Sequence, residues 1–374
     1  MKIPFNKPFI IGNEIQYIAD AVARGKISGD GHYSNLCQNF FEEKYGFKKC
    51  LLTTSCTDAL EMTAILADIK EGDEVIMPSY TFVSTSNAFV LRGAKLKFVD
   101  SRPDHPGMDE SKIAALITPS TKAIVVVHYA GVACNMDLIY SLIEGKNILI
   151  IEDAAQCIDS YYKSQPLGGI GHLAAFSFHE TKNIISGEGG MLVINDETLI
   201  ERAEIIREKG TNRAKFFRGQ VDKYNWVDIG SSFLPSEIIA AFLYAQLQNI
   251  ETIQKKRTMI WEKYHAVFSG LKDKVQLPAL PDFATNNAHM YYMVCRNLDE
   301  RQALIAHLKA NDVYAAFHYQ SLHKSPYYLQ HAEDISLPHC EHYSDCLVRL
   351  PFYFELSNAD QEHIINAIIS FYNK

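Results

Sequence analysis

A single lysine lies between an apolar run and a glycine-rich loop near the middle of the chain. The stretch SFHETKNIISGEGG, residues 177–190, contains Lys182. One lysine taken alone is most often a solvated surface charge. A lysine that is partly removed from water and close to other cations instead has a lowered pKa and becomes a nucleophilic amine. The choice between these interpretations depends on which residues the fold brings to Lys182.

Hydroxyl and aromatic side chains in two earlier stretches could act together with such a lysine. The run TTSCTDALEM leads from small hydroxyl residues into a predicted helix, whose first turn offers free N–H groups and a positive dipole end to an anion. Helix capping by Ser55 or Thr57 explains the same residues equally well. In MPSYTFVSTSNA, Tyr80 and Phe82 could stack on a flat heterocycle, although aromatic residues after a strand more often belong to the core.

A pair of carboxylates ends the strongly apolar run ILIIEDAAQC. Side chains alternate between the two faces of a strand, so only one of Glu152 and Asp153 can point into a given crevice. Carboxylates are rarely buried without a partner, and the inward one therefore needs a cation. A protonated ring nitrogen of a ligand would meet that need.

The apolar runs indicate the fold that must position these residues. Short β-rich runs recur between residues 75 and 194, and several are almost continuously apolar, which is typical of strands buried on both faces of a largely parallel sheet. Ligands of such doubly wound α/β sheets bind at the carboxyl ends of the strands. We therefore expect the chemically active stretches to meet at that edge.

The chain divides into three predicted parts. Residues 1–35 form an N-terminal segment, residues 36–247 the large domain, and residues 248–374 a smaller α+β domain. The smaller domain begins with a long helical pattern and continues with MYYMVCRNL as a strand, ERQALIAHLKAND as a helix and VYAAFHY as a strand. A length of 374 residues is sufficient for two such domains.

Composition excludes several classes of protein. A formal net charge of −8 disfavours binding to nucleic acid or to an anionic membrane surface. The apolar runs are shorter than the roughly 20 residues of a membrane-spanning helix, and MKIPFNKPFI lacks the features of a signal peptide. The cysteines form no CxxC pair, as expected of free thiols in a reducing compartment. We therefore expect a cytoplasmic protein.

The four active stretches together suit one cofactor. Pyridoxal 5′-phosphate (PLP) needs an anion cradle, an aromatic side chain for stacking, a carboxylate that keeps its ring nitrogen protonated, and a lysine for covalent attachment. Each signal is weak alone, but their combination after predicted strands is specific. The sequence therefore predicts a PLP site at Lys182.

The chain resembles the DegT/DnrJ/EryC1/StrS family of sugar-nucleotide aminotransferases over essentially its whole length. The motifs that carry the resemblance are TTSCTDALEM, GDEVIMPSYTFVSTSNA, VHYAGVACNMD, IEDAAQ, FSFHETKNIISGEGG and HYQSLH. The resemblance implies the fold-type-I, aspartate aminotransferase-like architecture and a homodimer with shared active sites. The stretches IIREKGTNRAKFFRGQVDKYNW and DIGSSF are similar to those of bacterial members that aminate C4 of dTDP-4-keto-6-deoxyglucose.

The resemblance also implies a role for each cofactor-binding residue. Lys182 would form the Schiff base with the cofactor and then carry the proton between cofactor and substrate carbons. Asp153 would pair with the ring nitrogen, Gln156 would bond the ring hydroxyl, and Phe82 would stack on the ring, which leaves Tyr80 as a weaker candidate. The phosphate would be held by Ser55, Cys56 and Ser177.

The chain departs from the family pattern at GSSFL, residues 230–234. Many relatives have a motif like GYNYR there, which reaches into the neighbouring subunit to hold the phosphate, and Ser231 or Ser232 would take over that role. The stretch ARGKISGDGHY would line the sugar site across the dimer interface. The residues expected to contact the nucleotide sugar are His179, Arg213, His318, Tyr319 and His323.

The implied reaction is a two-step transamination. An amino donor, by family analogy L-glutamate, converts the cofactor to its amine form, and the C4 keto group of dTDP-4-keto-6-deoxyglucose then receives the amino group. The product would be a dTDP-4-amino-4,6-dideoxyhexose, galacto or gluco, for O-antigen or other surface polysaccharide. The alternatives are a 3-keto sugar-nucleotide aminotransferase and a sugar dehydratase, in which histidine replaces the lysine. The presence of Lys182 favours transamination.

A different class of protein is suggested by the late cluster HKSPYYLQHAEDISLPHCEH. His339, Cys340 and His342 are potential metal ligands, but their spacing matches no zinc site, so we expect a surface loop and no metal. A noncatalytic regulator that binds the cofactor is a third possibility. The intact HETKN and EGG stretches count against it.

Overall fold

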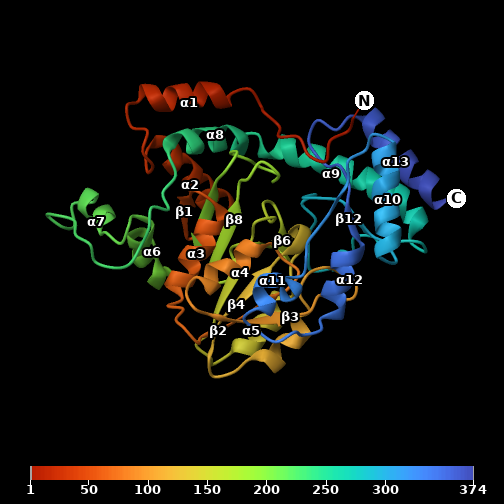
Figure 1. Cartoon of the computed structure of the whole chain (residues 1–374). Coiled ribbons are helices and arrows are strands. Elements are labelled where there is room, and N and C mark those ends of the chain that lie inside the picture. Colours follow the sequence, from red (N-terminus) through yellow and green to blue (C-terminus); the bar gives the residue numbers. More distant parts are fainter. Residues whose placement is uncertain (1, 374) are drawn as a thin grey trace.

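The computed structural model describes residues 2–373, which fold around a seven-stranded sheet (Figure 1). The strand order is β1–β9–β8–β5–β4–β2–β3, and β9 alone runs antiparallel to its neighbours. This is the mostly parallel α/β sheet that the sequence predicts. The strands are β1 (Lys49–Thr53), β2 (Glu74–Pro78), β3 (Lys95–Val99), β4 (Thr121–Val127), β5 (Leu149–Asp153), β8 (Leu173–Ser177) and β9 (Gly190–Ile194).

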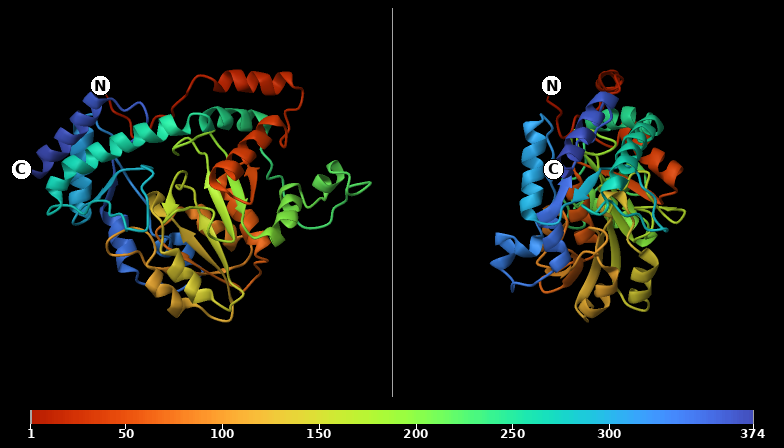
Figure 2. Two further views of the ribbon diagram at one scale, coloured as in Figure 1. Left: turned by 180° about the vertical axis from the view of Figure 1, so that it is seen from behind. Right: turned by 90° about the vertical axis from the view of Figure 1, so that its right-hand side faces the viewer.

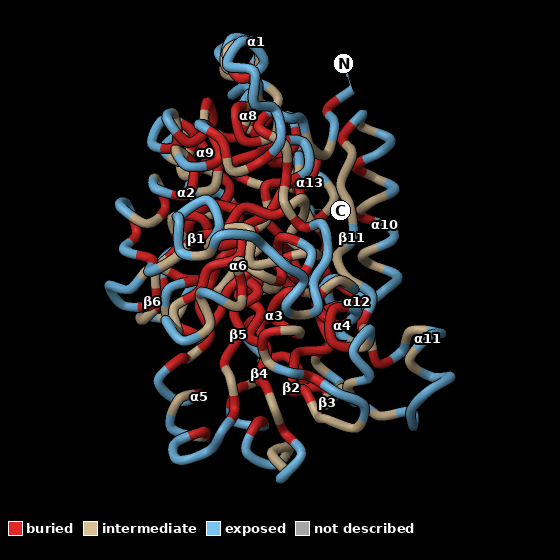
Figure 3. Tube along the Cα trace, turned by 90° about the vertical axis from the view of Figure 1, so that its left-hand side faces the viewer, coloured by how far each residue is buried: buried red, intermediate tan, exposed pale blue. Residues whose placement is uncertain are grey.

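The sheet is buried on both faces, as its apolar strand sequences require. Alternate residues of β4 belong to two different apolar clusters, with Ile124 and Val126 in one and Ala123 and Val125 in the other. Figure 3 shows the buried strands inside a more exposed outer layer. One face is covered by α2 (His32–Tyr45), α5 (Met136–Ile143) and α8 (Glu237–Leu247), and the other by α3 (Cys56–Leu66), α4 (Val83–Val90) and α6 (Ile200–Arg207).

A second, three-stranded antiparallel sheet lies in the C-terminal third, in the order β10–β12–β11. The helices predicted at residues 250–271 and 300–312 are present. The strands predicted at MYYMVCRNL and VYAAFHY are confirmed, but they are shorter than predicted. Strand β12, in the middle of this sheet, has no counterpart in the sequence prediction. The elements are α9 (Ile250–Phe268), β10 (Tyr292–Val294), α10 (Leu298–Ala310), β11 (Ala316–Phe317), α11 (Pro326–Leu329), α12 (Pro338–Cys346), β12 (Leu347–Arg349) and α13 (Asn358–Tyr372).

The N-terminal residues connect the two sheets along the top of the molecule in Figure 1. Ile3 forms a parallel bridge with Val313 beside the small sheet, and α1 (Glu14–Ala23) then packs on α8. The buried carboxylate of Glu14 accepts a hydrogen bond from Gln246 of α8 at 2.8 Å. The division into three parts stays a prediction, although α8 does end at Leu247.

The segment around His339 differs from the expected surface loop. Pro338 begins helix α12. Proline favours this position because an N–H group there would have no partner within the helix. Cys340 is buried, and its N–H donates to Asp100 at 2.8 Å. Within residues 2–373, no three His, Cys, Asp or Glu side chains lie close enough together to hold a metal.

Residues 208–235 form an excursion from the body of the molecule that includes the short helix α7 (Arg213–Phe217) (Figures 1 and 2). The excursion exposes large apolar side chains, with Trp226 81% and Phe217 69% accessible. Monomeric proteins rarely expose such residues together. Across the described part of the chain, no helix has both the length and the apolar character that a bilayer crossing demands.

Candidate active site

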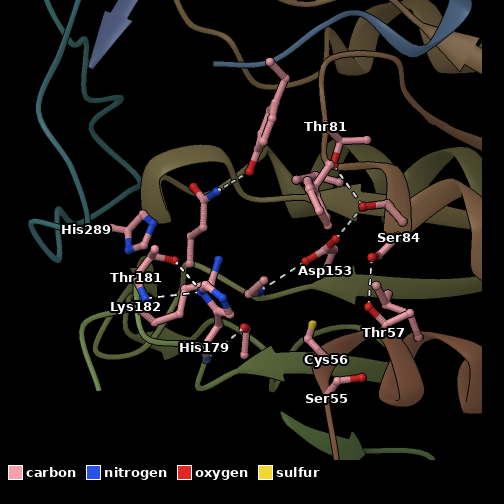
Figure 4. A pocket seen from close by; sticks show the side chains of 18 of the residues that line it. Ser55, Cys56, Thr57, Thr81, Ser84, Asp153, His179, Thr181, Lys182 and His289 are labelled. Carbon is pink, nitrogen blue, oxygen red and sulfur yellow. Dashed lines mark hydrogen bonds between the residues drawn. The ribbon is translucent and has the colours of Figure 1, made fainter. Parts of the chain in front are cut away.

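The carboxyl ends of the parallel strands border a cavity of about 560 Å³, a volume typical of small-molecule sites. Its walls come from the loops after β1, β2, β4, β5 and β8, and from the C-terminal third of the chain. Figure 4 shows Asp153 above Cys56 and Ser55, with Lys182 and His289 at the left of the view. The polar and aromatic lining includes Ser55, Cys56, Thr57, Thr81, Phe82, Thr85, His128, Asp153, Gln156, Ser177, His179, Lys182, His289, His318, Tyr319 and Arg349.

One corner of the cavity is suited to an anion. Ser55 caps helix α3, and its Oγ accepts a hydrogen bond from the N–H of Asp58 at 3.0 Å, which leaves the hydroxyl hydrogen free to donate. The N–H groups of Cys56 and Thr57 belong to the first turn, where helices have no internal partners. Ser177 also faces this corner. The helix dipole adds positive potential, so the corner can hold a phosphate.

Gly190, the first residue of β9, makes this corner possible. A Cβ on Gly190 would lie 2.3 Å from the carbonyl carbon of Ser55 and 2.4 Å from the nitrogen of Cys56. No side chain fits at such distances, so glycine lets β9 begin directly against the start of α3. Ser177 pairs with Gly190 across the β8–β9 ladder and is thereby placed beside the same helix end.

The adjacent carboxylates at the end of β5 lie on opposite faces, as strand alternation predicts. Asp153 lines the cavity. Glu152 is fully buried on the other side, where His128 Nε2 lies 3.0 Å from its carboxylate. The remaining donors to Glu152 are the N–H groups of Gly168, Ile170 and Gly171. Glu152 therefore has a structural role, and Asp153 is the carboxylate available to a ligand.

Asp153 is a buried carboxylate with spare hydrogen-bonding capacity. Its two oxygens accept from Thr85 Oγ1 at 2.7 Å and from the N–H of Ala155 at 3.2 Å. Burial raises the pKa of Asp153 and outweighs the opposing effects of these bonds and of the positive charge on Lys182. A cationic ring nitrogen beside Asp153 would favour its ionised form, because the opposite charge compensates for the hydration that burial removes.

Lys182 lies in the loop between β8 and β9, and its N–H donates to the carbonyl of His179 at 2.9 Å. Burial lowers its pKa; nearby Cys56 and Asp153 oppose the effect, and the positive charge of Arg349 adds to it. No described residue forms a hydrogen bond or ion pair with its amino group. A partly buried, unpaired amine with a lowered pKa is suited to covalent attachment to a carbonyl compound.

Gln156 and Tyr319 form part of the cavity wall and are hydrogen-bonded to each other. Gln156 Oε1 accepts from the N–H of Ala130 at 2.6 Å, and its Nε2 donates to the Tyr319 hydroxyl at 3.3 Å. Phe82 is exposed at the rim, with its ring centroid 6.1 Å from that of Tyr319. Tyr80 is buried behind the wall and is a core residue rather than part of the lining.

Several lining residues were not predicted from the sequence. Thr85 comes from the first turn of α4, and its contact with Asp153 has no signature in the sequence. Arg349 is the one cation in the apolar run CLVRLP, and this pattern could have indicated a buried functional cation. Its Nε is buried without a hydrogen-bond partner in the described structure, and its guanidinium lies over Phe5 at 4.9 Å. His289 follows a turn-rich stretch in which it was not distinguished.

Four residues predicted for the site are not part of the cavity lining in the single chain. His323 is buried elsewhere, with Nδ1 2.7 Å from Ser79 Oγ and Nε2 3.1 Å from Glu341. Both of its nitrogens thereby have partners within the chain, and its contact with the sugar stays a prediction. The other three lie in the excursion of residues 208–235 and are Arg213, Ser231 and Ser232.

The fold and the site define a fold-type-I, PLP-dependent aminotransferase. The chain belongs to the DegT/DnrJ/EryC1/StrS aminotransferase family, whose family model matches residues 8–369. Spr1654 from Streptococcus pneumoniae, solved in its PLP form, is 25% identical with a TM-score of 0.92, covering 100% of this chain and 99% of that one. The protein is therefore a sugar aminotransferase, and PLP is its cofactor.

Two further solved structures are similar over nearly the full length. A DegT DnrJ EryC1 StrS aminotransferase from Brucella abortus is 29% identical, with a TM-score of 0.87 and coverage of 97% of this chain and 96% of that one. The aminotransferase TlmJ from Streptoalloteichus hindustanus is 27% identical, with a TM-score of 0.90 and coverage of 99% of both chains. The resemblance found in the sequence motifs is thus confirmed at the level of the family.

The residues of the cavity fit PLP. The bound cofactor supplies an electron-withdrawing ring that stabilises negative charge on the carbon next to the amino nitrogen. Asp153 would keep the ring nitrogen protonated, because it is the buried carboxylate of the lining. The start of α3 and Ser177 would donate to the phosphate. Lys182 would provide the amine for attachment, and its lowered pKa would suit it to hold or move a proton.

Proposed function

We propose that the enzyme transfers the amino group of L-glutamate to the C4 keto group of dTDP-4-keto-6-deoxyglucose. The product is a dTDP-4-amino-4,6-dideoxyhexose that serves surface polysaccharide synthesis, such as that of O-antigen. The observation that carries the transamination chemistry is the unpaired amine of Lys182 in one cavity with Asp153. The choice of C4 and of the dTDP carrier is supported by the motifs at residues 205–233.

The amino donor is supported by the charge of the cavity. Arg349 lines the cavity and has no carboxylate partner among residues 2–373, and the position of its Nε away from water makes the missing hydrogen bond costly. A guanidinium in this state favours a ligand carboxylate. An amino acid donor brings such a group, and L-glutamate brings two.

The sugar is assigned to the hydrogen-bonding side chains of the lining that the cofactor leaves unused. His179, His318 and Tyr319 all line the cavity. The Tyr319 hydroxyl accepts from Gln156, and its own hydrogen is available to a ligand oxygen. The contacts of these residues with the hexose are part of the proposal.

We also propose that two copies of the chain form a homodimer with shared active sites. The exposed apolar residues Phe217 and Trp226 of the excursion support a protein interface, as does Phe82 at the cavity rim. In the dimer, Arg213, Ser231 and Ser232 would reach the partner's cavity. Sedimentation equilibrium of the wild type and of Trp226→Asp tests the dimer, and a monomeric wild type with full activity would refute it.

The substrate is tested by product analysis. The purified enzyme is incubated with dTDP-4-keto-6-deoxyglucose and L-glutamate, and the product is characterised by NMR. We expect a primary amine at C4, with axial or equatorial orientation read from the ring couplings. An amine at C3 from the isomeric 3-keto substrate, with no reaction at C4, would favour the 3-aminotransferase. Loss of a hydroxyl group without amination would instead favour the dehydratase, although Lys182 argues against it.

A further inference from the structure

His289 is a buried histidine of the cavity that none of the roles above uses. It lies in the segment before β10, is 4% accessible, and lines the cavity close to Lys182 (Figure 4). Its backbone is held on both sides, because its N–H donates to Asn287 Oδ1 at 3.0 Å and its carbonyl accepts from Arg257 at 2.6 Å. Its ring Nδ1 lies 2.8 Å from Asn183 Oδ1.

The neighbours of Asn183 determine which nitrogen of His289 carries the hydrogen. Asn183 Nδ2 donates to the carbonyl oxygen of Asn287 at 2.9 Å and to Gln254 Oε1 at 2.8 Å. A carbonyl oxygen can only accept, so the amide nitrogen of Asn183 must face it and the amide oxygen must face His289. The imidazole therefore donates from Nδ1. In the neutral ring, Nε2 is then an unprotonated acceptor, and no described residue bonds to it.

Two other histidines of the cavity have no such free acceptor. His128 uses both nitrogens, since Nε2 meets Glu152 at 3.0 Å and Nδ1 accepts from the N–H of Cys134 at 3.2 Å. In His179, Nδ1 accepts from the N–H of Thr181 at 3.3 Å, which places the ring hydrogen on Nε2.

The tautomer of the remaining cavity histidine, His318, is left open by its partner. Its Nδ1 lies 3.0 Å from the Tyr129 hydroxyl, which can donate or accept. His289 is thus the histidine of the lining whose hydrogen bonds assign a free acceptor nitrogen.

The groups around His289 keep it neutral. Burial lowers its pKa well below the ordinary value of 6.5, and the positive charges of Lys182, Arg349 and Arg257 act in the same direction. The other titratable group that interacts with it is His318, whose pKa is lowered in the same way. At neutral pH the Nε2 lone pair of His289 is therefore available to a proton donor.

We propose that His289 accepts, at Nε2, the proton that the primary ammonium group of the amino donor must lose inside the cavity. One N–H bond of the ammonium breaks and an Nε2–H bond forms, which leaves a neutral amine with a free electron pair and an imidazolium. The surrounding cations make this imidazolium short-lived, and it passes the proton to solvent. The inference rests on the aminotransferase activity and extends it to the step in which the donor enters.

Asn183 is the positioning residue in this arrangement. It follows Lys182 directly in the sequence, so the loop that carries the attachment lysine also sets the tautomer of the proton acceptor. Rotation of the Asn183 amide would bring two carbonyl-type oxygens face to face, which is why the tautomer cannot simply reverse.

The test compares His289→Asn with the wild type as holoenzymes. Asparagine keeps a donor toward Asn183 in place of Nδ1–H but has no basic nitrogen at the position of Nε2. The rate constant of the half-reaction with L-glutamate is measured from the change in cofactor absorbance between pH 7 and pH 9. We expect a loss of about tenfold or more at pH 7, below the usual contribution of a positioned base because the lowered pKa of His289 makes it a weaker base.

The pH dependence separates a base from a structural residue. The defect of His289→Asn should shrink by about tenfold for each pH unit, because solution hydroxide increasingly supplies the deprotonated donor. A loss that is equal at all pH values, or no loss, would overturn the proposal. Retained yellow colour and covalent attachment of the cofactor at Lys182 show that the variant is folded.

A second measurement does not depend on turnover or on the choice of donor. In cofactor-free protein with ¹⁵N-labelled histidine, NMR should show hydrogen on Nδ1 and none on Nε2 of His289. A hydrogen on Nε2 would overturn the inference. If wild-type enzyme ignores L-glutamate but accepts another amino acid, the donor assignment fails, and the same His289→Asn comparison is made with that amino acid.

Discussion

The two neighbouring carboxylates of β5 should respond in opposite ways to loss of their charge. Asp153→Asn should abolish most activity and leave the cofactor-free protein at least as stable as the wild type. Glu152→Gln should destabilise the protein and affect the chemistry much less. The two substitutions are one residue apart and remove the same charge, so each serves as the matched control of the other.

The magnitude of the activity loss follows from the burial of Asp153. Its partner would be the protonated ring nitrogen of PLP, and neutralising one member of a buried charge pair costs about 3–5 kcal/mol. At 1.36 kcal/mol for each factor of ten, the rate should fall about 10²–10⁴-fold. In the cofactor-free protein the sign reverses. Burial raises the folded-state pKa of Asp153 above 3.8, so its ionised form weakens the fold at pH 7, and asparagine removes that effect.

Glu152 has the opposite linkage. Burial alone would raise its pKa, but the bond from His128 and the N–H groups of Gly168 and Gly171 outweigh burial and lower the pKa below 4.5. Its ionised form thus stabilises the protein above pH 4.5, and this contribution is lost as the pH falls through the folded-state pKa. Glutamine leaves at least one buried donor unpaired, at a cost of about 1–3 kcal/mol.

Two assays decide the outcome. Thermal unfolding of the cofactor-free variants gives stability between pH 3 and pH 8, and steady-state kinetics of the holoenzymes give activity at pH 7.5. The reasoning is refuted if Asp153→Asn keeps activity within fivefold of the wild type. It is also refuted if Glu152→Gln is as stable as the wild type at pH 7, or if it shows the same acid destabilisation as the wild type below pH 4.5.

Further predictions concern the attachment lysine, the anion corner and the donor site. Lys182→Ala should lose turnover and fail to retain cofactor after borohydride reduction; retained turnover would contradict the assignment. Gly190→Ala should weaken PLP binding about 5–150-fold through about 1–3 kcal/mol of overpacking in titrations of the cofactor-free protein, whereas Gly270→Ala, with open space around it, should not. Arg349→Met should raise KM for L-glutamate about 10–150-fold, the equivalent of one charge-assisted hydrogen bond, without changing KM for the keto sugar; equal changes in both would argue against a donor-carboxylate site.

The part of the site formed by strand ends could be predicted because one rule covers it. Side chains that follow parallel strands meet at one edge, so Ser55, Asp153 and Ser177 are brought together by topology alone. The alternation of side chains along β5 predicts that Glu152 and Asp153 lie on opposite faces, and the family resemblance selects Asp153 as the one that meets the ligand. These inferences depend on local patterns that a single strand contains.

The contributions of the C-terminal third could not be predicted in the same way. His289 and Arg349 reach the cavity because the small sheet packs beside the large one, and no local pattern encodes that packing. Strand β12 has three residues, too few to show alternation. His323 was placed in the site because it is polar and close in sequence to His318, but Ser79 and Glu341 bind both of its nitrogens.

The reversed direction of β9 keeps the lysine loop separate from the connections between the sheet and its helices. Ser177 and Gly190 are paired residues of one ladder, so residues 178–189 leave and re-enter the sheet at the same point. A parallel β9 would need a long crossover connection, and the lysine loop would then form part of that crossover. Here the exposed positions of the loop can be changed between the two anchors without altering strand order, as long as Lys182, Asn183 and the buried Phe178 and Ile184 are kept and position 190 stays glycine. Substrate range could thus be re-engineered at His179, Thr181 and Glu188, the positions of this loop that line the cavity beside Lys182.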